Sequence, residues 1–158
     1  MRVVALLVSA TLLPAASVAD CGTDPAAAAR EFWEKHSHFN ERADPTLREV
    51  TTPRFYAALE REWDCIAKNA ACAPYDPWPH PDDTNIAGHP TFYVSLDRPD
   101  HVLVSMNYAL RSLYGRAGPQ QFVIMTLIQG PNGRCWLLDD LVTARQGSFR
   151  EQFRRPGS

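Results

Sequence analysis

A proline-rich segment, residues 74–90, divides this chain of 158 residues into two halves with different patterns. The segment holds five of the thirteen prolines, together with Trp78, two histidines and three aspartates. Because proline removes a backbone donor and fixes φ, neither a regular helix nor a central strand runs through such a segment. Apolar residues recur at helical spacing before it and alternate as in strands after it. We therefore expect an α+β fold in which residues 74–90 form a hinge loop between helices and sheet.

Residues 1–19 have the pattern of a secretory signal peptide. Arg2 precedes an apolar run over residues 3–13, and the segment ends with Ser17, Val18 and Ala19, a small-x-small cleavage pattern. The apolar run is shorter than the roughly 20 residues that a membrane-spanning helix needs. We expect cleavage after Ala19 and a periplasmic or secreted protein without a membrane span.

The size and the charge of residues 20–158 limit their domain number and their classes of function. Residues 20–158 number 139, which suits a single domain with its own core. They carry 15 Lys and Arg against 18 Asp and Glu, so they lack the broad basic surface of a nucleic-acid-binding protein. A basic cluster near the C-terminus is interpreted as a solvated chain end; it consists of Arg145, Arg150, Arg154 and Arg155.

All four cysteines follow the predicted cleavage site, and an even number in an exported chain favours two disulfides over a metal site. Four cysteines allow three pairings. On an unbroken helix Cys65 and Cys72 would lie about 10 Å apart, beyond the roughly 7 Å limit for a bridge, so this pairing requires the helix to end near Asn69. We favour Cys65–Cys72 with Cys21–Cys135, although spacing alone does not decide between the pairings.

Three helix starts are predicted by a capping residue followed by proline. The side chain of the capping residue accepts a hydrogen bond from a free N–H, and proline lacks a donor that the first turn of a helix does not use. The pairs are Asp24-Pro25, Asp44-Pro45 and Thr52-Pro53. They predict helices over residues 25–38, 45–50 and 53–69. The buried face of the third helix is expected to consist of Phe55, Leu59, Trp63, Ile66 and Ala70.

Two polar residues lie near the apolar faces of these helices. His36 falls within the stripe of the first helix, where a hydrogen-bonded core histidine is favoured over a catalytic one. Glu62 falls at the edge of the apolar face of the third helix. We favour a solvated flank there over a carboxyl with a raised pKa in a cavity.

The second half predicts an antiparallel sheet. Residues 91–97 and 101–110 form a hairpin, and residues 120–129, apolar on both faces, suit a central strand covered on two sides. After a tight turn, residues 134–143 return antiparallel and carry Asp139 and Asp140. Strand pleating sends these two to opposite faces, which leaves one as a possible inward base and excludes an acid–base pair on one face. A capping box at Ser148 predicts a short closing helix.

This order of helices and strands resembles the cystatin-like or nuclear-transport-factor-2-like α+β cone. More narrowly, the chain is similar to a bacterial family of exported domains of unknown function. The similarity rests on Tyr75-Asp76-Pro77-Trp78 before Asp82-Asp83, and on Trp136-Leu137-Leu138-Asp139-Asp140 before Ser148-Phe149. Leu138 stands where the family pattern has isoleucine, and Pro79-His80-Pro81 is an insertion. The resemblance implies a fold and an exported setting and implies no activity.

Two catalytic or ligand-binding hypotheses have weak support. An enzyme would use His36, Glu62, Asp139 or Asp140 as acid or base, but no Ser–His or Cys–His signature is present. A metal site would recruit His80, Asp82, Asp83 and His89, whose spacing matches no ligand pattern. We therefore expect no metal and no other cofactor.

The favoured function is that of an exported, non-catalytic binding domain, of the kind that inhibits or protects against a secreted or envelope protein. Its binding residues would lie on the hinge loop, where proline stiffens exposed aromatic groups; they are Tyr75, Trp78, His80, Asp82 and Asp83. An equal alternative is that Trp78 packs back onto the domain and seals the cone. The alternative function is a small enzyme or small-ligand binder with an inward histidine or carboxylate.

Overall fold

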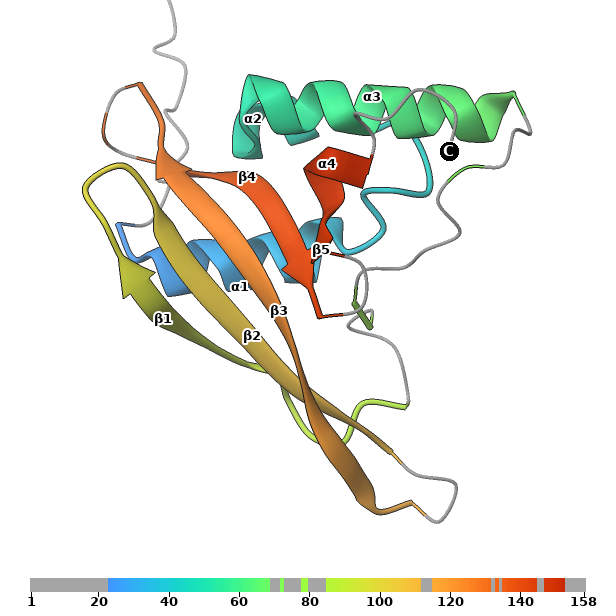
Figure 1. The fold of residues 1–158 in the computed structure, drawn as a ribbon, viewed down its shortest axis with the longest axis vertical. Coiled ribbons are helices and arrows are strands. Elements are labelled where there is room, and N and C mark those ends of the chain that lie inside the picture. Colours follow the sequence, from blue (N-terminus) through green and yellow to red (C-terminus); the bar gives the residue numbers. More distant parts are fainter. Residues whose placement is uncertain are drawn as a thin grey trace, which may run out of the picture.

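The computed structural model describes residues 23–68, 72, 78–79, 85–111, 115–131, 133, 135–144 and 147–152. An α+β fold is confirmed, with an antiparallel sheet and a few helices (Figure 1). The elements in chain order are α1 (Pro25–His36), α2 (Leu47–Val50), α3 (Pro53–Ala67), β1 (Thr91–Asp97), β2 (Val102–Arg111), β3 (Ala117–Gln129), β4 (Trp136–Thr143), β5 (Gly147–Ser148) and α4 (Phe149–Gln152). No helix in these residues is long and apolar enough to cross a membrane.

Two of the three predicted helix caps are present. The Asp24 side chain accepts a hydrogen bond from Ala26 N, and the Thr52 hydroxyl accepts one from Phe55 N, so α1 and α3 begin at the expected prolines. Both helices end two residues earlier than predicted.

The predicted start of the second helix is wrong. Asp44 Oδ1 accepts hydrogen bonds from both the backbone N and the hydroxyl of Thr46, and Asp44 O accepts from Leu47 N. Asp44 therefore closes a turn before the helix, and α2 begins at Leu47 with no side-chain cap.

The five strands pair antiparallel in the order β1-β2-β3-β4-β5, so each strand lies beside its neighbour in sequence. The hairpin of β1 and β2 is confirmed. Irregular registers interrupt the sheet, among them one at Ser95 in β1 and one at Asp139 in β4, where two residues oppose one on the partner strand.

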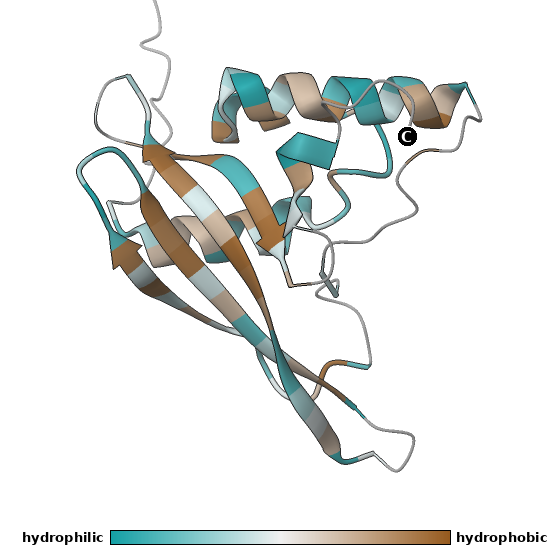
Figure 2. Cartoon of the chain, viewed as in Figure 1, coloured by the Kyte–Doolittle hydropathy of each residue, from teal (hydrophilic) through white to brown (hydrophobic). Residues whose placement is uncertain are grey.

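The core lies between the helices and one face of the sheet. Figure 1 shows α1 running behind the strands and α3 above them. Ring contacts join α1, α3, α4 and the loop before α2 into one aromatic cluster. Hydrophobic residues gather in the upper part of the strands in Figure 2. The cluster and the strand residues packed on it include Phe32, Phe39, Phe55, Trp78, Phe149, Val104, Met106, Val123, Met125 and Leu141.

The prediction that β3 is covered on two sides is wrong. The strand is central in hydrogen-bonding order, and Val123, Met125 and Leu127 on one face are buried. On the other face Ile124 is only partly buried and the Phe122 side chain is 48% exposed. No described helix lies over that face of β1–β3 in Figure 1.

Candidate functional site

Asp139 is the centre of the most extensive polar cluster in the described residues. Its side chain is 2% exposed and accepts hydrogen bonds from Thr52 Oγ1 at 2.7 Å, from Arg54 Nε and Nη2, and from Arg150 Nη1 at 2.6 Å. Arg54 therefore forms a two-pronged ion pair with the carboxylate, and Arg150 closes it from α4. One carboxylate fixes the first turn of α3 and the closing helix on β4.

The bulge in β4 brings the second aspartate to the same place. Asp140 accepts hydrogen bonds from Ser148 Oγ at 2.5 Å and from the backbone N of Leu141 and Arg150, at 2.9 and 3.0 Å. Both aspartates thus contact Arg150, and the predicted separation onto opposite faces is wrong. The reason is the bulge, since pleat alternation does not hold across an inserted residue.

The charge state of Asp139 follows from these contacts. Burial alone raises the pKa of a carboxyl, but hydrogen bonds from Arg54 and Thr52 and the charges of Arg150 and Arg54 together outweigh burial. The net result is a pKa for Asp139 below its ordinary value of 3.8. A carboxylate held ionised by two guanidinium groups is a poor general base at neutral pH, so the arrangement indicates a structural role.

One of the two hydrogen bonds of the predicted capping box is present at the closing helix. Glu151 N donates to Ser148 Oγ at 3.1 Å, while the hydroxyl of Ser148 is directed to Asp140. Phe149 is buried against Phe39 and Phe55, at ring-centroid distances of 5.2 and 5.7 Å. The closing helix is thus held by one aromatic ring and by the paired aspartates.

Glu62 is inside the protein, so the interpretation of this residue as a solvated flank is wrong. The residue is 3% exposed, and its Oε2 is buried without a hydrogen-bond partner among the described residues. Burial raises the pKa of this carboxyl above its ordinary value of 4.5. On the same helix Ile66, predicted to be buried, is 39% exposed, so the packed face is rotated toward Glu62.

Glu62→Gln is expected to raise the free energy of unfolding at pH 7 by about 1–2 kcal/mol, because it removes a buried charge that lacks a partner. The folded-state pKa is raised, so the folded protein holds the proton more tightly and loses stability as pH rises from 4.5 through that pKa. The gain in the variant should therefore vanish below about pH 4.5 in denaturant titrations at several pH values. Glu34→Gln, an exposed change on α1, is the control; equal gains in both variants would contradict the burial effect.

His36 is a partly buried histidine beside a carboxylate, as the core interpretation predicts. Its Nδ1 lies 3.7 Å from Asp44 Oδ2, and its ring lies 5.4 Å from that of Phe32. The pKa of Asp44 is lowered chiefly because the Thr46 hydroxyl donates to it, with a smaller contribution from His36. His36 thus links the end of α1 to the turn before α2.

Trp78 seals the interior. The residue is 2% exposed, its ring lies 5.6 Å from that of Phe39 and 6.0 Å from that of Phe32, and its Nε1 donates to Ser37 O at 3.0 Å. The sealing interpretation is correct, and the prediction of Trp78 as an exposed binding anchor is wrong because a buried indole is inaccessible to a partner. The other predicted loop residues, Tyr75, His80, Asp82 and Asp83, lie outside the described residues.

The disulfide Cys65–Cys72 is present, with the two Cα atoms 5.6 Å apart. As expected for this bond, α3 ends before Asn69, at Ala67. Cys135 is also disulfide-bonded, and its predicted partner Cys21 lies outside the described residues.

A sheet face that carries two exposed aromatic side chains is the feature that we did not predict. Tyr93, Ser105, Ile124 and Val142 form one cross-strand row, and Asn107 and Phe122 form part of the next. Neighbouring positions in β2, β3 and β4, such as Val104, Val123 and Leu141, are buried in the core, so these side chains point to the opposite face of the sheet, where Ser105 is itself buried. Tyr93 and Phe122 are each 48% exposed, and Asn107 Nδ2 donates to Tyr93 Oη at 3.3 Å. We call these six residues the outer sheet face.

A sequence signal for this surface was present in β3. Six apolar residues lie within residues 122–128, a pattern that is typical of a strand buried on both faces and is shared by a strand with one uncovered apolar face. To predict a strand with one uncovered apolar face, one must know that no helix packs on that face, and a local sequence pattern does not contain this information.

The predicted site residues are therefore not gathered in one place. Asp139 and Asp140 form one cluster, Glu62 and His36 are separate, and Trp78 belongs to the core. Within the described residues, no three His, Cys, Asp or Glu side chains are placed so that they could hold a metal ion.

Comparisons of the chain with protein-family models, with curated proteins and with solved structures find no match.

Proposed function

We propose that this chain is an exported, non-catalytic domain that binds another protein through the outer sheet face. The secretory pattern of residues 1–19 and the disulfide Cys65–Cys72 support the exported setting. In this proposal the fold is a cystatin-like or nuclear-transport-factor-2-like cone whose interior is packed. The partner is a secreted or envelope protein, toward which the domain acts as an inhibitor or immunity protein does.

The observation that carries the proposal is the contrast between the two faces of the sheet. The inner face meets the aromatic cluster, which Trp78 closes, and the carboxylates of Asp139 and Asp140 in β4 are bonded to Arg54, Arg150 and Ser148. These contacts direct both carboxylates to bonds within the domain. The outer sheet face, by contrast, presents two large aromatic side chains to solvent.

The chemistry of the outer sheet face suits a protein partner. It contains no charged residue, and the aromatic rings of Tyr93 and Phe122 flank the polar groups of Ser105 and Asn107. Exposed aromatic groups on rigid strands lose little conformational entropy on binding, and such residues dominate protein interfaces. We therefore expect Phe122 and Tyr93 to supply most of the binding energy.

Phe122→Ser is expected to weaken partner binding at least about tenfold, the effect of losing one aromatic anchor. The measurement is capture of proteins from the secreted and envelope fractions by the oxidised domain, followed by a binding isotherm with the purified captured protein. Leu110→Ser is the matched control, because Leu110 is exposed on β2 next to an irregular register outside the outer sheet face. Equal affinity of the wild type and Phe122→Ser would contradict the proposal.

The buried carboxyl of Glu62 favours a second function, a small-ligand site that uses an inward acid. An unpartnered buried Oε2 with a raised pKa suits a proton donor to a bound molecule. If Glu62 serves a ligand, Glu62→Gln abolishes ligand binding or turnover; if it is a core residue, the only effect is the gain in stability described above.

A further inference from the structure

β1 is an edge strand of the sheet that the structure describes. Among the described residues it pairs with β2 alone, and five of its seven residues are exposed. An edge strand presents unpaired N–H and C=O groups, which proteins commonly protect with lysine, proline or inward charges. Residues 91–97 contain no lysine, arginine or proline. Asp97 at the end of the strand and the bulge at Ser95 are protective, but they leave residues 91–94 uncharged and in regular register with β2.

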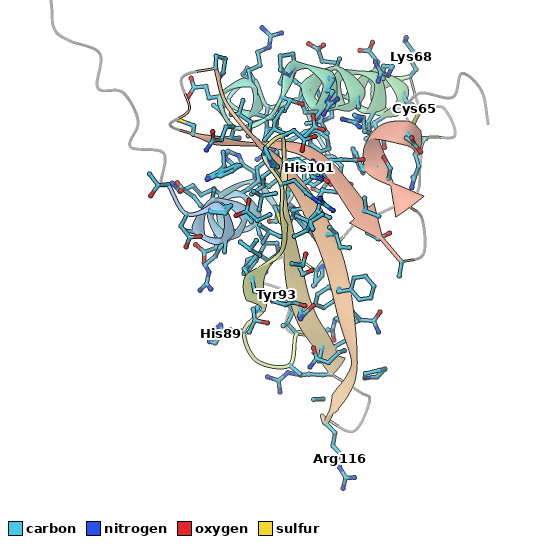
Figure 3. The ribbon with its side chains drawn as sticks, turned by 60° about the vertical axis from the view of Figure 1, so that its left-hand side comes forward. Cys65, Lys68, His89, Tyr93, His101 and Arg116 are labelled. Atoms are coloured by element: carbon cyan, nitrogen blue, oxygen red, sulfur yellow. A yellow bond between two sulfur atoms is a disulfide. The ribbon has the colours of Figure 1, made fainter. Side chains whose placement is uncertain are left out.

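The edge strand is complementary to a second copy of itself. An antiparallel pairing with the two-fold axis at Tyr93 sets Tyr93 against Tyr93 and Phe92 against Val94 of the second copy. Tyr93 and Val94 are exposed in one copy and thus available to the other. The pairing brings Asp97, the one charged residue of β1, near His89 of the second copy instead of near another carboxylate. Figure 3 labels Tyr93 on β1 and His89 in the segment that precedes this strand.

We infer that two copies of this chain pair through the β1 edge and form a symmetric dimer with a continuous sheet. The backbone groups of residues 92–94 supply the hydrogen bonds, and the aromatic pair at Tyr93 lies on the outer sheet face. The dimer therefore joins two outer sheet faces into one surface. The contact is short and below the size of stable interfaces, so the dimer forms and dissociates reversibly with concentration.

Sedimentation velocity of the oxidised protein, over about a hundredfold range of concentration, measures this self-association. We expect a concentration-dependent equilibrium of monomer and dimer. Tyr93→Lys and Tyr93→Glu, each alone, should weaken dimerisation by about fivefold or more, because like charges meet at the two-fold axis. An equimolar mixture of the two variants should regain the dimer, because opposite charges then meet. Recovery in the mixture also shows that each variant is folded.

Phe122→Lys is the matched control. Phe122 has the same exposed fraction as Tyr93 and lies on the same face, but two strands from the edge, at roughly 10 Å. The Phe122→Lys variant should dimerise like the wild type. A wild type that is monomeric at every concentration, a mixture that stays monomeric, or a loss of dimer in Phe122→Lys would each overturn the inference. Because Phe122→Ser tests partner binding and leaves the edge intact, failure of one proposal is distinguishable from failure of the other.

Discussion

Asp139→Asn is expected to lower the free energy of unfolding by about 3–5 kcal/mol, the cost of removing one partner from a buried ion pair. The neutral amide leaves Arg150, which is mostly buried, without its counter-charge, and gives Arg54 a poor acceptor in place of a two-pronged one. The bond from Thr52 is weakened as well, so α3 and α4 both lose their attachment to β4. Chemical denaturation at pH 7 measures the loss.

The pH dependence of this loss provides a second readout. Asp139 has a folded-state pKa below 3.8, so its contribution is present above pH 3.8 and is lost as pH falls through the folded pKa. The stabilities of wild type and Asp139→Asn should therefore converge in acid. Asp97→Asn, an exposed carboxylate on β1, should change stability by less than about 0.5 kcal/mol. If Asp139→Asn also lowered the free energy of unfolding by less than about 0.5 kcal/mol, the polar cluster around Asp139 would not stabilise the fold.

Trp78→Ala is expected to lower the free energy of unfolding by about 3–5 kcal/mol, the range for truncating a buried aromatic side chain. The change removes ring contacts with Phe32 and Phe39 and leaves the buried carbonyl of Ser37 without its donor. Thermal and denaturant unfolding measure the effect. Reduced partner capture by this variant would reflect lost structure and not a lost binding anchor.

A second substitution separates packing from hydrogen bonding at this position. Trp78→Phe keeps most of the apolar contact and loses the indole N–H, so it should cost about 1–2 kcal/mol. Tyr93→Ala, an exposed aromatic truncation, should cost less than about 0.5 kcal/mol. If Trp78→Ala were as mild as Tyr93→Ala, Trp78 would not seal the core.

Features that depend on neighbouring residues were predictable from the sequence. The caps Asp24 and Thr52 and the hairpin of β1 and β2 each follow from a few adjacent residues. The disulfide Cys65–Cys72 was the favoured one of three pairings that spacing alone left open. The α+β class follows from the change of periodicity at the hinge loop.

Features that depend on distant contacts were not predictable. Arg54 has a side chain that is 56% exposed on α3, yet it reaches Asp139, which is 85 residues away in sequence. No local pattern identifies a partner at that separation. The bulge at Asp139 and the rotation that buries Glu62 depend on how α3 and α4 pack on the sheet, which no local pattern specifies.

Side-chain footprinting with hydroxyl radicals tests most directly whether a partner protein binds through the outer sheet face, since it reports which aromatic groups a bound protein covers. In the free domain we expect Tyr93 and Phe122 to be modified and Trp78 to be spared. On addition of the captured partner, Phe122 and Tyr93 should become protected while Leu110 stays reactive. Protection of hinge-loop residues such as Tyr75, with Phe122 unchanged, would contradict binding through the outer sheet face.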